Sequence, residues 1–147
     1  MEDQFDTLDL SDNEIKKFDN FPKMTRLRTV LLTNNHVTRI DPRVGNNLPL
    51  LEHLVLTNNR IANLSDLDAL AAFPSLSTLS LVDNIVTRRP NYRPYVIHKV
   101  PQLKALDFRK IKPKEREAAA QLFATEAGQK IITAVSAAKE QTQKVRL

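Results

Sequence analysis

One phrase, L-x-x-L-x-L-x-x-N-x-L, occurs four times in this chain and limits what the chain can fold into more than any other feature. In the first copy, Phe5 takes the place of the leading leucine. The asparagines of the four copies are Asn13, Asn35, Asn59 and Asn84, at steps of 22, 24 and 25 residues. This is the period of a leucine-rich repeat, in which each repeat stacks on its neighbours.

Each phrase predicts one short strand with apolar side chains on its inner side. In the second copy, Val30 and Leu32 alternate along the strand and face inward, while Leu27 and Val37 fill the core from the adjoining turns. One repeat cannot bury these side chains alone, so the repeats must stack. We therefore predict an α/β solenoid of the leucine-rich-repeat type, with parallel strands on the concave face and short helices and loops on the convex face.

The phrase asparagines are expected to support the fold. Each one leaves its strand at a sharp turn, where its amide can bond backbone groups that the turn leaves without partners. A ladder of asparagines that binds a ligand is the alternative interpretation of the same four residues.

The segments between the phrases predict the convex side. Residues 41–49 are expected to form a loop. Residues 64–74 predict a short helix, because Ser65 or Asp66 can cap its start and Pro74 follows its end.

The C-terminal part predicts a cap and then a helical extension. A fifth phrase at 103–111 has Ile111 where the asparagine would be, which is typical of a terminal repeat. The preceding residues 91–101 predict a helix with Pro94 in its first turn. We divide the chain into repeats with their cap, 1–112, and an extension, 113–147. The extension is expected to be helical, with Gly128 interrupting it and QTQKVRL frayed at its end.

The first repeat is expected to have an open flank. Phe5, Leu8 and Leu10 have no capping helix before them in this sequence. Since repeat arrays normally need a polar terminal cap, we expect either a preceding segment or another surface to cover that side.

Composition and motifs argue against catalysis. The chain has no cysteine and only two glycines, Gly45 and Gly128, so the glycine-rich nucleotide and hydrolase motifs are absent. His36, His53 and His98 do not have the spacing of metal ligands. We expect one domain with no catalytic residues, cofactor, metal or small-molecule substrate. No stretch has the roughly 20 apolar residues that span a bilayer, and we expect no membrane association.

The residues between the inward-facing leucines predict a concave surface that binds a protein partner, because they point away from the core. This surface is small, polar and mildly acidic, with an apolar centre at Leu31 and Val55, so a helix with basic and apolar residues would complement it. Simple solvent exposure is the alternative. The members of the concave surface are Thr7, Asp9, Ser11, Asp12, Thr29, Leu31, Thr33, Asn34, His53, Val55, Thr57, Asn58, Thr78, Ser80, Val82, Asp83 and Asp107.

Positive charge is concentrated behind the repeats. Residues 1–98 carry 11 Lys and Arg against 12 Asp and Glu, whereas residues 99–147 carry 11 against 5. Five cations form what we call the basic cluster, namely Arg109, Lys110, Lys112, Lys114 and Arg116. Such a cluster favours phosphate contact. A solvated helix start or a nuclear-localisation stretch would have the same composition.

The segment NYRPYVIHKVPQLKALDFRKIKPKERE resembles the cap of the leucine-rich A-prime proteins of the U2 small nuclear ribonucleoprotein, which belong to the spliceosome. FDTLDLSDNEI and LTNNRI resemble repeats of the same family, and the resemblance covers residues 4 to about 123. It implies a non-enzymatic nuclear protein whose concave surface cradles a helix of an RNA-recognition-motif partner of the B-double-prime type. Together the two proteins would bind a U2 small nuclear RNA stem-loop.

The resemblance also implies roles for particular residues and has limits. Arg109, Lys110, Lys112, Lys114 and Arg116 would contact the RNA backbone, while the partner would read the bases. The family has an N-terminal cap and one more repeat before the FDTLDL-like phrase. The tail of the family is also more basic than the tail of this chain, so we expect no RNA contact after residue 117.

Other leucine-rich-repeat adaptors, such as phosphatase regulators or cytoskeletal modules, would use the concave face without any RNA role. The acidic nuclear leucine-rich proteins share a similar cap helix but have a long acidic tail, whereas this chain ends basic.

Overall fold

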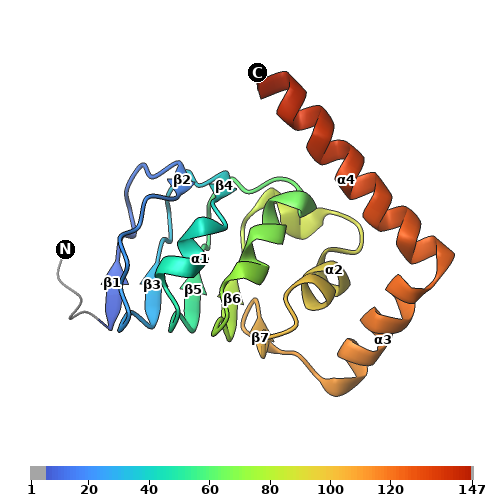
Figure 1. Ribbon diagram of the computed structural model, residues 1–147, viewed down its shortest axis with the longest axis horizontal. Helices are drawn as coiled ribbons and strands as arrows, with labels where there is room; N and C mark the ends of the chain where they lie inside the picture. Colours follow the sequence, from blue (N-terminus) through green and yellow to red (C-terminus); the bar gives the residue numbers. More distant parts are fainter. Residues whose placement is uncertain (1–5, 147) are drawn as a thin grey trace.

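Five short parallel strands, one from each phrase, lie side by side and form the concave face of a solenoid (Figure 1). The computed structural model describes residues 6–146, with side chains from 6 to 139. The strands are β1 (Thr7–Asp9), β3 (Thr29–Leu31), β5 (His53–Val55), β6 (Thr78–Ser80) and β7 (Ala105–Leu106). Their pairing is in register, so equivalent positions of successive repeats lie next to each other. The predicted leucine-rich-repeat solenoid is confirmed.

The core forms from the inward-facing positions of these strands. Val30 and Leu54, at the strand centres, are 0% exposed. Leu8, the equivalent residue of β1, is only half-buried, as are Leu10 and Ile15. This difference follows from the position of β1 at the edge of the sheet, where no described strand covers its outer side. Phe5 lies outside the described residues.

Three of the four phrase asparagines connect their repeat to the one before it. The Asn59 amide donates to the backbone oxygens of Leu32 and Leu56, at 2.9 and 3.0 Å, and its Oδ1 accepts the Val37 N–H at 2.9 Å. Asn35 and Asn84 make the equivalent bonds and are buried. Asn13 is exposed, and among the described residues 6–139 its amide donates to carbonyls of its own turn, those of Leu10 and Ser11. The structural interpretation of the asparagines is therefore confirmed.

The residue before each phrase asparagine has a left-handed backbone. These residues are Asp12, Asn34, Asn58 and Asp83, with φ between 55° and 60°. Aspartate and asparagine adopt this conformation more readily than other non-glycine residues, because their short polar side chains can bond locally. In each pair, the first residue (Asp or Asn) thus adopts the turn conformation, and the side-chain amide of the second, the phrase asparagine, bonds the backbone of the turn.

The convex side holds short helices and a second small sheet. Strands β2 (Lys17–Phe18) and β4 (Arg39–Ile40) pair in parallel there, followed by the 3-10 helices η1 (Leu64–Ala72) and η2 (Ile85–Arg88). Phe18 stacks on Phe73 with ring centroids 5.9 Å apart, which links the first repeat to the third.

Two predictions for the convex side are wrong in part. Residues 41–49 contain a short helix, α1 (Arg43–Asn47), because the Asp41 carboxylate accepts the Arg43 N–H and starts a turn. Residues 64–72 are helical as predicted, but the helix is of the 3-10 type and its N-cap is Asn63 rather than Ser65 or Asp66. Asp66 instead accepts the Asn63 N–H at 3.2 Å.

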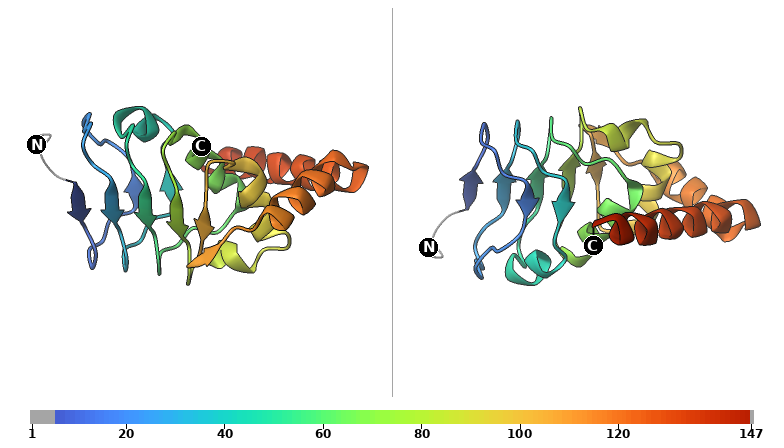
Figure 2. Two further views of the ribbon diagram at one scale, coloured as in Figure 1. Left: turned by 90° about the horizontal axis from the view of Figure 1, so that it is seen from below. Right: turned by 90° about the horizontal axis from the view of Figure 1, so that it is seen from above.

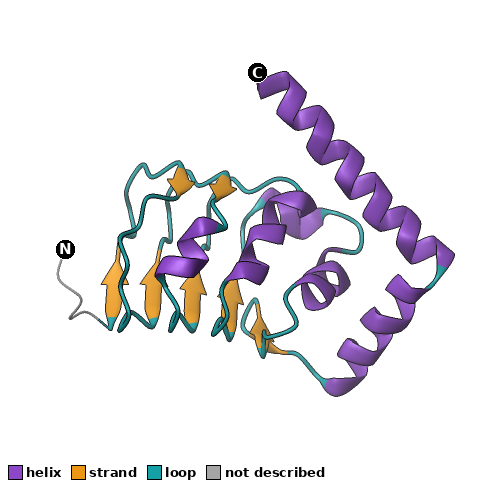
Figure 3. Ribbon diagram, viewed as in Figure 1, coloured by secondary structure: helices purple, strands orange, loops and turns teal. Residues whose placement is uncertain are grey.

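Helices gather toward the C-terminal half of the chain (Figure 3). The predicted cap helix is α2 (Tyr92–Lys99), with Pro94 in its first turn. After β7 the chain reverses into β8 (Arg109–Lys110), which pairs antiparallel with β7 and ends the sheet. Helix α3 (Pro113–Ala124) packs on α2 and buries Ala119 and Phe123. The division of the chain at residue 112 stays a prediction.

The helical extension breaks at Thr125 and not at Gly128. The Thr125 hydroxyl donates to the Leu122 carbonyl and accepts the Gly128 N–H, so it closes α3 and caps α4 (Glu126–Arg146). A Cβ on Gly128 would lie 2.0 Å from the Leu122 carbonyl oxygen, so glycine permits the close approach of the two helices. Helix α4 then runs back over η1 (Figure 2). Helix α4 extends to Arg146, and the expected fraying of residues 141–147 stays a prediction.

Asn59→Ala should lower the free energy of unfolding by roughly 2–3 kcal/mol, because it leaves the buried Val37 N–H without its partner. It also removes one of the two amide bonds that each of the Leu32 and Leu56 carbonyls accepts. Asn13→Ala is the matched control and should change it by less than about 1 kcal/mol, since Asn13 is exposed. Urea unfolding followed by circular dichroism measures both. Equal losses for the two variants would contradict the structural role assigned to the buried amides.

Candidate partner and RNA interface

The strand register brings together the residues predicted to form the concave surface. Thr7, Thr29, His53 and Thr78 lie in one row, and Asp9, Leu31, Val55 and Ser80 lie in the next. The backbone bonds continue past the strand ends, for example from the Asn34 N–H to the Thr57 oxygen. They align the two remaining rows, which are Ser11, Thr33, Thr57 and Val82, and then Asp12, Asn34, Asn58 and Asp83. A continuous surface across four repeats results.

Hydrogen bonds between repeats fix several polar side chains of this surface. His53 Nδ1 lies 2.6 Å from the Thr78 hydroxyl. Thr57 and Ser80 share a 2.8 Å bond. The Asn58 amide donates to Asn34 Oδ1 at 2.8 Å, and the Asn34 amide donates to the Asp12 carboxylate at 2.7 Å. A partner would therefore lose less side-chain entropy on binding here than on a surface of free rotamers.

The apolar centre predicted for the surface is present. Leu31 and Val55 are register neighbours on β3 and β5, and both are half-buried. Val82, one repeat further and one row over, is also half-buried. Apolar side chains in such a patch can lose their remaining exposure against a partner, at about 25 cal/mol per Å².

Two predicted members of the concave surface differ from the rest: Ser80 is buried, and Asp107 uses both carboxylate oxygens within the fold. One carboxylate oxygen accepts the Leu81 N–H at 2.6 Å, and the other accepts the Tyr92 hydroxyl at 2.7 Å. Burial, and next the Asp107 charge, raise the pKa of the Tyr92 phenol. Asp107 is thus engaged within the cap, and a role for it in partner contact stays a prediction.

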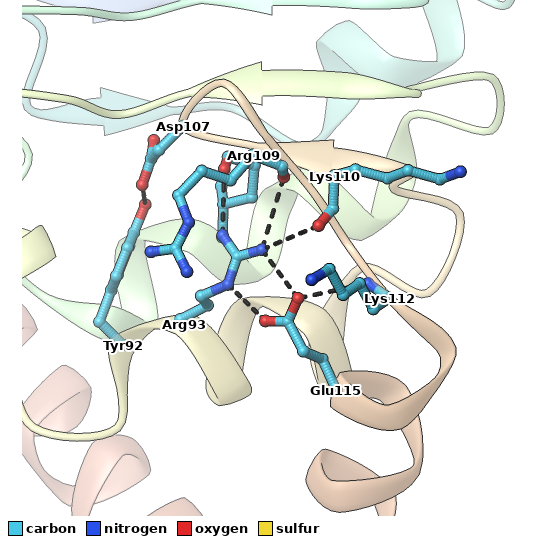
Figure 4. Close-up of polar contacts among 8 residues, drawn as sticks. Tyr92, Arg93, Asp107, Arg109, Lys110, Lys112 and Glu115 are labelled. Atoms are coloured by element: carbon cyan, nitrogen blue, oxygen red, sulfur yellow. Dashed lines mark hydrogen bonds and ion pairs between the residues drawn. The ribbon is translucent and has the colours of Figure 1, made fainter.

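Arg93 of α2 holds the segment that carries the basic cluster (Figure 4). Its guanidinium donates to the Leu106 carbonyl at 3.0 Å and to the carbonyls of Arg109 and Lys110. It also pairs with the Glu115 carboxylate, with Nε–Oε2 at 2.6 Å. This hydrogen bond is the main cause that lowers the pKa of Glu115 to about 2. Glu115 in turn accepts the Lys112 N–H at the start of α3.

The basic cluster separates into two kinds of side chain. Arg109, Lys110, Lys112 and Lys114 are exposed. The first three line a shallow open groove together with Glu115. Arg116 is half-buried and donates to the carbonyls of Pro101 and Leu103, so it braces the cap. The four exposed cations are the ones free to meet phosphate.

Sequence reasoning missed Arg93 and Glu115. Both lie in segments that the resemblance quoted, YRPYVI and KER, but the pattern did not indicate that they pair across 22 residues. The sequence gives little indication of this ion pair, because single charged residues on separate helices are common and do not show which of them will meet.

The described residues contain neither a metal centre nor a membrane span. No group of three or more His, Cys, Asp or Glu side chains within residues 6–139 could hold a metal ion. Between residues 6 and 146, no helix has the length and apolar character needed to cross a bilayer.

Comparison with known proteins places this architecture among its relatives. The family described as leucine-rich repeat matches residues 1–136. The U2 small nuclear ribonucleoprotein A′ of Arabidopsis thaliana is 56% identical over 135 residues, which are 92% of this chain and 54% of that protein. The same protein of Homo sapiens is 51% identical over 121 residues, which are 82% of this chain and 48% of that protein. The chain spans about half the length of the curated relatives it matches.

Solved structures agree with these similarities. A chain in the crystal structure of the Drosophila melanogaster SNF/U2A′ complex superposes with a TM-score of 0.88 at 47% identity, covering 90% of this chain and 76% of that one. The Mex67 LRR domain from Chaetomium thermophilum gives a TM-score of 0.54 at 30% identity, covering 63% of this chain and 64% of that one.

Glu115→Gln should lower the free energy of unfolding at pH 7 by about 1–2 kcal/mol, because it removes the charge that Arg93 meets. The folded-state pKa of Glu115, about 2, is below its usual value of 4.5. The ion pair therefore stabilises the fold above pH 4.5, and this contribution is lost as the pH falls toward 2.

Urea unfolding at pH 7 and at pH 2.5 (roughly the lower end of this window) measures the effect. The difference between wild type and Glu115→Gln should shrink at the lower pH, while exposed Glu117→Gln should change little at either. A difference that stays constant with pH would contradict the assigned pair.

Proposed function

Because this chain belongs to the U2 small nuclear ribonucleoprotein A′ family of leucine-rich-repeat proteins, we propose that it serves a nuclear splicing particle without a catalytic role of its own. In this proposal, its concave surface binds an RNA-recognition-motif protein of the B-double-prime type. The assembled pair then binds a stem-loop of U2 small nuclear RNA.

The observation that carries the proposal is the likeness to a Drosophila U2A′ that was solved in a complex with SNF. With 47% identity and a TM-score of 0.88, the two folds correspond over 90% of this chain. The aligned concave surface offers a partner a preordered polar frame around Leu31 and Val55. A helix with apolar and basic residues complements this surface, because Asp9, Asp12 and Asp83 lie on it and are exposed.

In this proposal, the exposed cations of the basic cluster contact the RNA. Arg109, Lys110, Lys112 and Lys114 would neutralise phosphates, which adds affinity and orientation without sequence preference. Base recognition would belong to the partner, whose domain class reads unpaired bases by stacking and hydrogen bonding.

A gel shift with the RNA-recognition-motif partner and a U2 stem-loop RNA tests the proposal as a whole. The chain should supershift the partner–RNA complex. A chain that binds the partner but leaves RNA binding unchanged would support a generic adaptor, and a chain that binds neither would contradict the proposal.

Val55→Glu should weaken binding of the protein partner by roughly tenfold or more, because a carboxylate at the centre of the interface would be buried without a counter-charge. Leu50→Glu is the matched control, since Leu50 is an exposed apolar residue outside the strands. Isothermal titration calorimetry measures both, with circular dichroism as the check on folding. Equal affinities for Val55→Glu and the wild-type chain would contradict the concave assignment.

The triple variant Lys110→Ala, Lys112→Ala and Lys114→Ala should reduce the salt dependence of ternary RNA binding by about two to three units of slope, about one for each phosphate contact. The matched control is Lys16→Ala, Lys17→Ala and Lys23→Ala, which removes three exposed lysines far from the cap. Fluorescence anisotropy across a salt series measures the slopes. Indistinguishable slopes for the two triple variants would exclude the basic cluster from RNA contact.

A further inference from the structure

Phe108 is the most exposed large apolar side chain in the described part of the chain, at 77%. It forms, with Asp107, the two-residue turn between β7 and β8, and the two φ angles are 64° and 54°. Turns with positive φ at both positions normally use asparagine, aspartate or glycine, because a bulky side chain is strained there. Neither burial nor backbone preference therefore explains a phenylalanine at this position.

The surrounding structure holds the strained turn in place. The Asp107 carboxylate is fixed by the Leu81 N–H and the Tyr92 hydroxyl. Arg93 binds the carbonyls of Leu106 and Arg109 on either side of the turn. A strained residue that persists in such a fixed setting, with its side chain left in solvent, points to a function for that side chain.

The neighbours of Phe108 indicate what its ring meets. Arg109, Lys110 and Lys112 lie within the next four residues of the chain and are exposed. Aromatic rings beside cations are the chemistry of surfaces that bind unpaired nucleotides, where the ring stacks on a base and the cations meet phosphates.

A protein contact is less well supported by the geometry. In the row of Val55, buried Ser80 and the engaged carboxylate of Asp107 lie between that residue and the turn of Phe108, so no apolar side chain of this row connects the two.

We propose that Phe108 stacks on an unpaired base of the RNA whose phosphates meet the basic cluster. This inference rests on the proposed function and deepens it, because it gives the chain a direct contact with a base in addition to its contacts with the backbone. The contact is sequence-tolerant, since every base has a face on which an aromatic ring can stack.

Phe108→Gly is the central variant of the test, because glycine accepts the left-handed backbone without strain. It should raise the midpoint of thermal unfolding by a few degrees and yet weaken ternary RNA binding roughly tenfold or more. Phe108→Tyr keeps the ring and should bind as wild type does, while Phe108→Leu keeps apolar character without a ring and should bind weakly.

The probe is a U2 stem-loop RNA with 2-aminopurine at each unpaired position in turn, in the presence of the RNA-recognition-motif partner. At one position, the wild-type chain should quench the fluorescence and Phe108→Gly should not. Unchanged ternary affinity for Phe108→Gly would overturn the inference. An equal loss of affinity for the partner without RNA would overturn it too, because the ring would then contact protein.

The same experiment separates this inference from the proposed function. If the wild-type chain joins the partner and the RNA while Phe108→Gly joins equally well, only the role of Phe108 fails. If the wild-type chain does not join them, the proposed function fails and the stacking inference fails with it.

Discussion

The buried side-chain amide in the turns of the second, third and fourth repeats is the interaction on which the rest of the structure depends. Asn35, Asn59 and Asn84 each bond carbonyls of their own turn and a carbonyl and an N–H of the preceding repeat. Leucine packing alone would allow neighbouring repeats to slide, because the hydrophobic effect has no direction. The directional amide bonds fix the register, and the fixed register aligns the outward-facing residues into one surface.

At the C-terminal end, charged groups take over what the amides do elsewhere. The fifth phrase has Ile111 in place of asparagine, and Ile111 is buried. Asp107 accepts the N–H of Leu81 in the preceding repeat instead, and Arg93 binds the carbonyls of the reversing chain. The β7–β8 hairpin, which ends the sheet and is held by Arg93, therefore also presents the basic cluster and Phe108 to solvent. A change that loosens the cap would disturb both the fold and the proposed RNA surface.

The sequence predicts the strands, the inward-facing leucines and the asparagine bonds because each depends on a short pattern that recurs. It does not predict contacts between segments of unlike sequence. The helix break illustrates this, since helix propensity favours Gly128 whereas the Thr125 hydroxyl makes the actual break. Arg116 was expected to face RNA from its charge and from the family resemblance, yet its guanidinium bonds cap carbonyls. Phe108 gave no signal, because its exposure and positive φ exist only in the folded hairpin.

Amide chemical shifts of the isotopically labelled chain, recorded during titration with the RNA-recognition-motif partner and then with the RNA, test the central claim most directly. The account predicts that the partner shifts residues of β1, β3, β5 and β6, and that the RNA then shifts residues 108–114. Shifts concentrated in α1, η1 and α4, with the strands unaffected, would contradict it, because the partner would then bind the convex side.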